Sequence, residues 1–478
     1  MKKFRNAAIL ILFSSFFFNA CSVFQPGKPL LQKRIDSLMV TDFFKTTQVG
    51  ISVYDLKNNQ PVYEQNEKLL FRPASNQKIF TTAAALKFLS ANHKFSTVVS
   101  YSGELKDSVC SGNLYFTGGF DPEFSSHDLD SLVKEIKKAG IKEIKGNLYG
   151  DVSAMDSMFW GSGWIWDDDP EAYMPYLSPL TINKNCIIIS FKPGAIGSPA
   201  VISLNPEINF LPIINTSVTT ENGKSDFRIT RDWLNRKNTI LVSGNLPAKS
   251  NPESVTLNLV NPALNFLNLA KESLIKNKII LNGIIDTSTI KMPVTKITSF
   301  ERDINYIIKV TNKRSDNLNA EMVLRETAHK YFGKSASADK GKVLVDSLII
   351  LAGKNPRQYK FIDGSGLSYY DLLTADLITN VLKYMYEQEP SIKENFINSL
   401  PVAGIDGTLS NRFKNSPVKG HLFAKTGTLS GVSNLSGYLD TVNGNKLAFS
   451  ILIQNFVGSA SMAREFQEKI CQIFYQEL

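Results

Sequence analysis

Ser75 and Lys78 form the first pair of residues in the chain whose types and spacing could do chemistry. In the segment FRPASNQKIFTTAAALKFL, Pro73 ends an extended entry and apolar residues then recur at helical spacing, so Ser75 lies at or near the start of a predicted helix. A lysine three positions later projects from the same helix face. If burial or a neighbouring cation keeps Lys78 neutral, its amine can accept the serine proton and make Ser75 a nucleophile for acyl transfer.

The spacing of this pair is weak evidence by itself. The same S-x-x-K spacing occurs at Ser131/Lys134, Ser273/Lys276, Ser288/Lys291, Ser337/Lys340 and Ser416/Lys419. The first pair differs because it lies at a predicted helix start directly after Pro73-Ala74 and is accompanied, in order, by an SDN motif at 315–317 and a KTG motif at 425–427. These three motifs in this order are the set found in penicillin-binding proteins and class A β-lactamases. Together they predict a serine acyl-enzyme site.

Further segments carry a resemblance to one family. They are PASNQK, GGFDP at Gly118–Pro122, GWIWDD at 163–168, DGSGLS at Asp363–Ser368, SLPVAGIDGTL at Ser399–Leu409, and AKTGTL. With the three motifs, they make the chain resemble the penicillin-binding protein 4 type of D-alanyl-D-alanine carboxypeptidase and endopeptidase, serine peptidase family S13. The resemblance covers nearly the whole mature chain.

The pattern along the chain predicts an α/β fold whose halves are split by an insertion. A hairpin is expected over 49–63, helices return after Asn305, and three antiparallel strands precede a closing helix from about Ser461. Between these parts, 97–296 is mainly strand with one helix in NPALNFLNLAKESLIKNKI. The resemblance implies a penicillin-recognising (β-lactamase/transpeptidase-like) α/β sandwich with two inserted, mainly β domains.

A chain of 478 residues is too long for a single core, so several domains are expected. Ser75 and Ser315 are 240 positions apart (315 − 75), far more than in a class A β-lactamase. The predicted division is a signal peptide at 1–20, a tether at 21–30, a catalytic domain at 31–96 and 297–478, inserted domain II at 97–205 and 257–296, and inserted domain III at 206–256.

Roles in the site follow from the resemblance together with charge and geometry. Ser75 attacks the carbonyl between two D-alanines while neutral Lys78 takes its proton. Ser315 can relay that proton to the leaving nitrogen. Asn317 can hold the substrate peptide and position Lys78, whereas Asp316 is expected to turn away into a structural bond.

The KTG segment is expected to bind the end of the substrate. Lys425 and the Thr426 hydroxyl can meet a terminal carboxylate, and Gly427 leaves room for the approach of the substrate backbone. By resemblance, the oxyanion hole consists of the backbone N–H groups of Ser75 and Thr428.

Asp168 matches an aspartate that, in the family, faces the cleft from the inserted domain and contacts the amino group of diaminopimelate. Its neighbour Asp167 is a near-equal candidate from sequence alone. The alternative is that Asp167, Asp168 and Asp169 form a solvated acidic loop.

The first twenty residues, MKKFRNAAILILFSSFFFNA, have the basic start and apolar run of a secretory signal. Phe18 disfavours ordinary cleavage after Ala20, and Cys21 follows directly, which resembles a bacterial lipoprotein start with an acylated cysteine. We expect an enzyme of the periplasm or cell envelope, anchored to a membrane through lipidated Cys21. Plain secretion to the periplasm is the alternative.

Composition excludes several other classes of protein. The net charge of +9 is scattered among acids without a basic and aromatic stripe, so no nucleic-acid partner is expected. The histidines are widely separated, so we expect no metal and no cofactor. Cys110 and Cys186 could form a disulfide, although unpaired buried thiols are the simpler interpretation.

The favoured function is a D-Ala-D-Ala carboxypeptidase that also cleaves D-Ala to diaminopimelate crosslinks. Its partners are peptidoglycan stem peptides and crosslinks, and β-lactams are expected to inhibit it. A β-lactamase would share the same motifs, but the long insertion argues against that alternative. A non-catalytic β-lactam or murein sensor is the third hypothesis, although no motif is missing.

Overall fold

The computed structural model describes residues 28–478. The predicted signal peptide, and Cys21 with its predicted lipid, lie outside the described residues. Within 28–478, no helix has the length and apolar character needed to cross a membrane. In the same range, no group of three or more His, Cys, Asp or Glu side chains is placed to hold a metal ion. Cys110, Cys186 and Cys471 are free thiols there.

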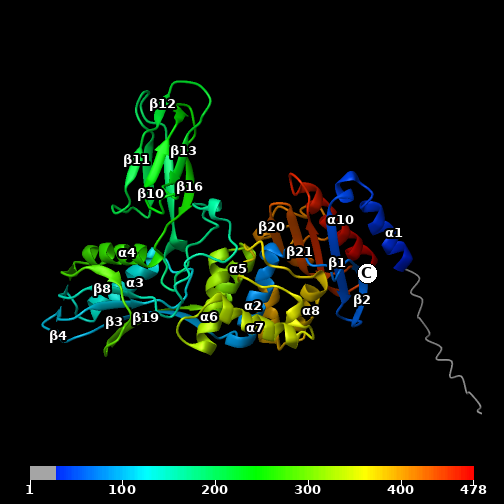
Figure 1. Ribbon diagram of the computed structural model, residues 1–478, viewed down its shortest axis with the longest axis horizontal. Coiled ribbons are helices and arrows are strands. Elements are labelled where there is room, and N and C mark those ends of the chain that lie inside the picture. Colours follow the sequence, from blue (N-terminus) through cyan, green and yellow to red (C-terminus); the bar gives the residue numbers. More distant parts are fainter. Residues whose placement is uncertain (1–27) are drawn as a thin grey trace, which may run out of the picture.

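A five-stranded antiparallel sheet joins the two ends of the described chain, in the order β2-β1-β22-β21-β20 (Figure 1). Its strands are β1 (Gln48–Asp55), β2 (Gln60–Gln65), β20 (Leu422–Leu429), β21 (Val432–Asp440) and β22 (Lys446–Gln454). The predicted hairpin and the three predicted C-terminal strands are confirmed. Strand β20, which carries the KTG motif, lies at the edge of the sheet.

Helices cover both faces of this sheet. Because side chains alternate between the two faces of a strand, each strand contributes to the packing on both sides. In β22, Phe449 and Ile451 pack against α1 (Lys28–Leu38) and α10 (Ser461–Glu477), whereas Ala448 and Leu452 pack on the other face. Helix α8 (Ala375–Tyr386) packs directly on that other face. It belongs to a helical layer that also contains α2 (Gln77–Leu89), α5 (Ile304–Lys313), α6 (Asn317–Phe332), α7 (Ala338–Leu351) and α9 (Pro390–Ser399).

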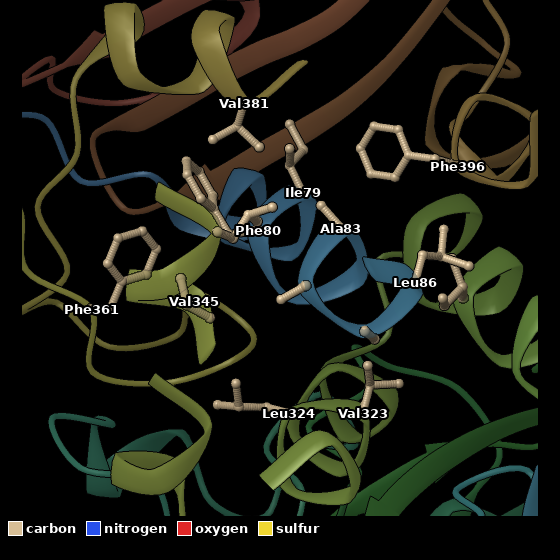
Figure 2. Packing of buried hydrophobic residues seen from close by; sticks show 14 of the residues in the cluster. Ile79, Phe80, Ala83, Leu86, Val323, Leu324, Val345, Phe361, Val381 and Phe396 are labelled. Carbon is tan, nitrogen blue, oxygen red and sulfur yellow. The ribbon is translucent and has the colours of Figure 1, made fainter. Parts of the chain in front are cut away.

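Helix α2 lies at the centre of the helical layer. Figure 2 shows its Ile79, Phe80 and Ala83 surrounded by side chains of other helices, among them Val323 and Val381. A helix that is buried all round is expected where apolar residues cover every face. Because the helix is buried from its first turn, its one early lysine is fully buried as well.

Inserted domain II begins with β3 (Lys94–Tyr101) and ends with β19 (Thr295–Asp303), which pair with each other. Its larger sheet has the order β18-β8-β6-β3-β19, with β6 (Leu114–Thr117), β8 (Leu148–Asp151) and β18 (Ile285–Thr287). The smaller sheet contains β4 (Leu105–Lys106), β5 (Val109–Cys110), β7 (Glu143–Ile144) and β17 (Ile280–Leu281).

Two helices pack on this domain, and the sequence interpretation found only α4 (Pro262–Lys276). It missed α3 (Ser126–Lys138), although Ser125 and Asp128 form a capping box at its start. Leu129, Leu132, Val133 and Ile136 also recur there at helical spacing and are buried.

Inserted domain III projects away from the rest of the molecule (Figure 1). Its sheets are β10-β9-β16, β11-β14-β13 and β12-β15, formed by β9 (Cys186–Lys192), β10 (Val201–Asn205), β11 (Ile213–Asn215), β12 (Val218–Thr220), β13 (Arg228–Arg231), β14 (Ile240–Ser243), β15 (Asn245–Pro247) and β16 (Glu253–Asn258). Because β9 and β10 pair within this unit and share its core, we propose boundaries near 186 and 258, wider than the predicted 206–256.

Candidate active site

Ser75 lies on a tight 3-10 turn, Ala74–Asn76, that leads directly into α2. Ala74 has a φ of 46°, a left-handed conformation that costs free energy for a residue with a side chain. The turn is held from the sheet, because Asn76 Nδ2 donates to Ser436 Oγ of β21 at 2.6 Å. A partly exposed serine is therefore presented by a firmly anchored turn.

Two glycines press against this turn. A Cβ at Gly427 of β20 would lie 2.7 Å from the carbonyl oxygen of Pro73, and one at Gly366 would lie 1.9 Å from that of Ala74. Such distances exclude any side chain unless the turn moves. The sequence predicts that Gly427 leaves room for the substrate backbone. In the structure, its lack of a side chain leaves room for the turn that carries Ser75.

Lys78 is fully buried one helical turn after the nucleophile. Its Nζ lies 2.9 Å from Ser75 Oγ and donates to Asn317 Oδ1 and to the backbone carbonyl of Ser365, each at 2.7 Å. Asn317 Nδ2 donates to the carbonyl of Tyr173 at 2.7 Å, which fixes Oδ1 as the atom facing Lys78. Two of the three neighbours of Nζ are therefore acceptors only.

This arrangement suits a neutral amine. A neutral lysine has two N–H donors and one lone pair, so it can satisfy Asn317 and Ser365 and still accept the hydroxyl proton of Ser75. Burial lowers the pKa of Lys78 from 10.5 to about 8, although Asp363, Asp316 and Glu321 oppose the shift. Of the two causes that the sequence left open, burial is therefore the one found for Lys78.

The SDN motif joins the loop before α6 to the first turn of that helix. Ser315 has a φ of 58°, and Asn317 is the first helical residue. Asp316 caps the helix, because its Oδ1 accepts from the backbone N–H of Asn319 at 2.8 Å, and its Oδ2 pairs with Lys184 at 3.0 Å. As expected, Asp316 makes structural bonds.

Lys425 lies on β20 and is also fully buried. Its Nζ donates to Ser315 Oγ at 2.8 Å and to the carbonyl of Thr426 at 2.7 Å. Burial, together with the positive charge of Lys78, lowers the pKa of Lys425 well below its usual value. Two buried lysines in one site disfavour two simultaneous positive charges.

A pocket of about 450 Å³ opens over these groups. Of the predicted residues, it is lined by Ser75, Ser315, Asn317, Thr428 and Asp168. The two lysines and Gly427 are not among its lining residues. The Thr426 hydroxyl donates to Thr408 Oγ1 at 2.8 Å.

The three consecutive aspartates have three different surroundings. Asp168 lines the pocket, whereas Asp167 is exposed and does not line it. Asp169 is buried and paired with the fully buried Arg231 of β13. The interpretation as one solvated acidic loop is therefore wrong, and Asp168 is the aspartate that can meet a substrate.

Sequence reasoning missed several residues of the site. Tyr173, Met174 and Tyr369 line the pocket, and the carbonyls of Tyr173 and Ser365 hold Asn317 and Lys78. Ser365 belongs to the DGSGLS segment, one of the segments that carry the family resemblance. No motif marked Tyr173 or Met174, because they lie on an irregular loop of the inserted part.

The pKa of Lys78 gives a testable pH dependence. We expect kcat/KM to rise with pH and to level off above about 8, because only neutral Lys78 can accept a proton. The measurement is the pH profile of kcat/KM on a D-Ala-D-Ala peptide. A profile that falls with pH through this range would contradict the role of Lys78 as base.

The fold and the site together define an active-site-serine hydrolase on the penicillin-recognising α/β fold. The chain belongs to the D-Ala-D-Ala carboxypeptidase 3 (S13) family, whose family model matches residues 31–476. The resemblance found in the sequence is thereby confirmed.

Related proteins agree with this assignment. The chain is 31% identical to "D-alanyl-D-alanine carboxypeptidase" of Actinomadura sp. (strain R39), over 91% of this chain and 82% of that protein. It is 27% identical to "D-alanyl-D-alanine carboxypeptidase DacB" of Haemophilus influenzae, over 86% of each chain. The crystal structure of penicillin binding protein 4 from Haemophilus influenzae superimposes with a TM-score of 0.82 at 24% identity, covering 92% of this chain and 99% of that one.

Proposed function

We propose that this protein removes the terminal D-alanine from peptidoglycan stem peptides through an acyl-enzyme on Ser75. The observation that supports it most directly is the surroundings of Lys78 Nζ, where two fixed acceptors leave one position for the Ser75 hydroxyl. A base with a pKa of about 8 is well matched to catalysis near neutral pH.

In the acylation step, Ser75 Oγ attacks the carbonyl between the two D-alanines and its proton passes to Lys78. The carbon–nitrogen bond breaks, and Ser315 relays the proton held by Lys78 to the leaving amine, so Lys78 is neutral again before deacylation. Ser315 Oγ also contacts Lys425. Water then attacks the acyl-enzyme, with Lys78 as base, and releases the shortened peptide and free Ser75. Backbone N–H groups of Ser75 and Thr428 are proposed to hold the oxyanion.

The two lysines are proposed to divide one positive charge between them. A substrate carboxylate beside Lys425 and Thr426 would favour the cation on Lys425. That cation would oppose a second charge on Lys78 and so keep the base neutral. Substrate binding thus prepares the nucleophile for attack.

The finer parts of the proposal concern substrate and location. Cleavage of D-Ala to diaminopimelate crosslinks is supported by an acidic side chain, Asp168, in the pocket wall. Acylation by β-lactams is supported by the same serine and lysines, because a β-lactam offers the same carbonyl and carboxylate. We also propose export, with Cys21 lipidated and the catalytic body in the periplasm.

Chromatography of purified muropeptides after incubation with the enzyme tests the function. We expect loss of terminal D-alanine from pentapeptides and conversion of crosslinked dimers to monomers. Absence of both changes would refute the proposal. Labelled penicillin separates the alternatives, since a persistent adduct supports the peptidase and fast release of hydrolysed drug supports a β-lactamase.

Asp168→Asn is expected to raise KM about 5-fold for stem peptides with a free amino group on the third residue, as for a partly exposed ion pair worth ~1 kcal/mol. KM for the same peptide with that amino group acetylated should not change. Asp167→Asn is the matched control, because it removes the same charge from an exposed neighbour outside the pocket. Equal effects of the two substitutions would contradict a direct contact from Asp168.

A further inference from the structure

A second cavity lies beside the catalytic pocket, and we call it the tryptophan pocket. It has a volume of about 290 Å³, and its walls include Phe159, Trp160, Trp166, Tyr176, Trp233 and Arg236. Three of the four tryptophans of the chain line it, and the fourth, Trp164, packs against Trp160 with ring centroids 5.5 Å apart. No role in acyl transfer accounts for this cluster.

The tryptophan pocket faces solvent and is not part of a core. Trp166 is 66% exposed, Leu234 69% and Phe159 42%. Large apolar side chains gathered on a surface mark binding sites, because leaving them in water forfeits the free energy of burial. An occupant would recover that free energy.

Two different inserted domains build the pocket. Trp166 comes from the loop of domain II, Trp233 follows β13 of domain III, and their ring centroids are 5.3 Å apart. Arg236 lies over the ring of Phe159 at 4.4 Å. The walls are braced, because Tyr176 Oη donates to Asp169 at 2.9 Å and Asp169 pairs with Arg231.

The tryptophan pocket and the catalytic pocket share one segment of chain, residues 165–176. Asp168 and Tyr173 of this segment line the catalytic pocket, whereas Trp166, Asp169 and Tyr176 line the tryptophan pocket. Alternating residues of one short segment therefore line both pockets, so the two pockets are neighbours along this loop.

We propose that the tryptophan pocket binds a sugar ring of the glycan chain to which the stem peptide is attached. This inference rests on the proposed function, because in peptidoglycan every stem peptide is joined to a chain of N-acetylated hexosamines. The C–H face of a pyranose ring packs on the electron-rich face of an aromatic ring, and Arg236 can donate to its hydroxyl or acetyl oxygens. A cavity of this volume fits a small ligand and is too small for a helix or strand of a partner.

The test compares two substrates, a free D-Ala-D-Ala pentapeptide and the same pentapeptide joined to its disaccharide. Trp233→Ala should raise KM about 5-fold for the disaccharide substrate and leave the free peptide unchanged, an effect of the size of one aromatic contact. Trp166→Ala should do the same and should leave the fold intact, because Trp166 is 66% exposed. Phe332→Ala, which removes a 44% exposed aromatic side chain of α6 outside the pocket, is the control.

Direct binding is measured without turnover, by titrating intrinsic tryptophan fluorescence with N-acetylglucosamine oligosaccharides. We expect a saturable change in the wild type that is lost in Trp233→Ala. If the wild type hydrolyses neither substrate, the proposed function fails. The fluorescence titration still tests whether the tryptophan pocket binds sugar, because it requires no turnover. The sugar site would be overturned if the oligosaccharides caused no fluorescence change and if the ratio of KM for the disaccharide substrate to KM for the free peptide were the same in all variants. That result would leave the proposed carboxypeptidase activity standing. A dimer in gel filtration that Trp233→Ala dissociates would instead assign the pocket to a second copy of the chain.

Discussion

Replacing Ser75 with alanine is expected to lower kcat by roughly 10⁴-fold or more and to abolish labelling by penicillin. The reason is that Ser75 Oγ is the one hydroxyl placed between the pocket and the buried Nζ of Lys78, at 2.9 Å, among the described residues. The fold should persist, because this hydroxyl makes only that side-chain contact. Muropeptide turnover and mass spectrometry of the penicillin adduct measure the two effects, and circular dichroism checks the fold.

Ser131→Ala is the matched control for this experiment. Ser131 is also followed by a lysine three positions later, Lys134, but on helix α3, where its hydroxyl bonds back to the carbonyl of His127. This variant should retain wild-type turnover. A Ser75→Ala protein that still formed a covalent penicillin adduct would refute the assignment of the nucleophile.

Replacing Lys78 with methionine is expected to slow acylation by about 10²- to 10⁴-fold, the range that a positioned general base contributes. Methionine keeps much of the buried volume but removes the base and leaves Asn317 Oδ1 and the Ser365 carbonyl without their donor. The free energy of unfolding should therefore fall by about 1–3 kcal/mol as well. Single-turnover acylation by labelled penicillin and denaturant unfolding separate the two effects.

Lys78→Arg distinguishes a base from a mere cation. Arginine stays protonated at any working pH, so it could keep a positive charge near Ser75 but could not accept a proton. We expect acylation to remain slow in this variant and the rise of kcat/KM toward pH 8 to disappear. Full activity in Lys78→Arg would show that the charge of residue 78 matters and its basicity does not. Lys134→Met serves as the surface control.

The chemistry of the site was predictable because its residues come in short motifs. S-x-x-K needs only one helical turn to bring Ser75 to Lys78, and local geometry determines that distance. The SDN and KTG motifs could be assigned to the same site as S-x-x-K because the three motifs follow one another in the expected order. Their contacts in space, Lys78 to Asn317 and Lys425 to Ser315, agree with the predicted grouping.

Other features depended on contacts between distant segments and had no local pattern. Asp167 and Asp168 are equivalent in the sequence, and only the path of their loop places Asp168 in the pocket. Helix α3 is a different case, because its capping box and helical spacing are local patterns from which it could have been predicted. The boundary we propose for domain III rests on the pairing of β9 with β10 and with β16, which strand patterns alone do not reveal.

The sequence by itself predicted Ser75 as nucleophile, Lys78 as its base and the class of reaction, because neighbours along a helix are set by backbone geometry. Only the tertiary structure decided how the pKa of Lys78 is lowered, since burial of Lys78 requires α2 to be enclosed by sheet and helices from the whole catalytic domain. It also decided why Gly427 and Gly366 are glycines, and that the tryptophans meet beside the cleft. These properties arise from packing between segments that are distant in the sequence, and no short pattern encodes them.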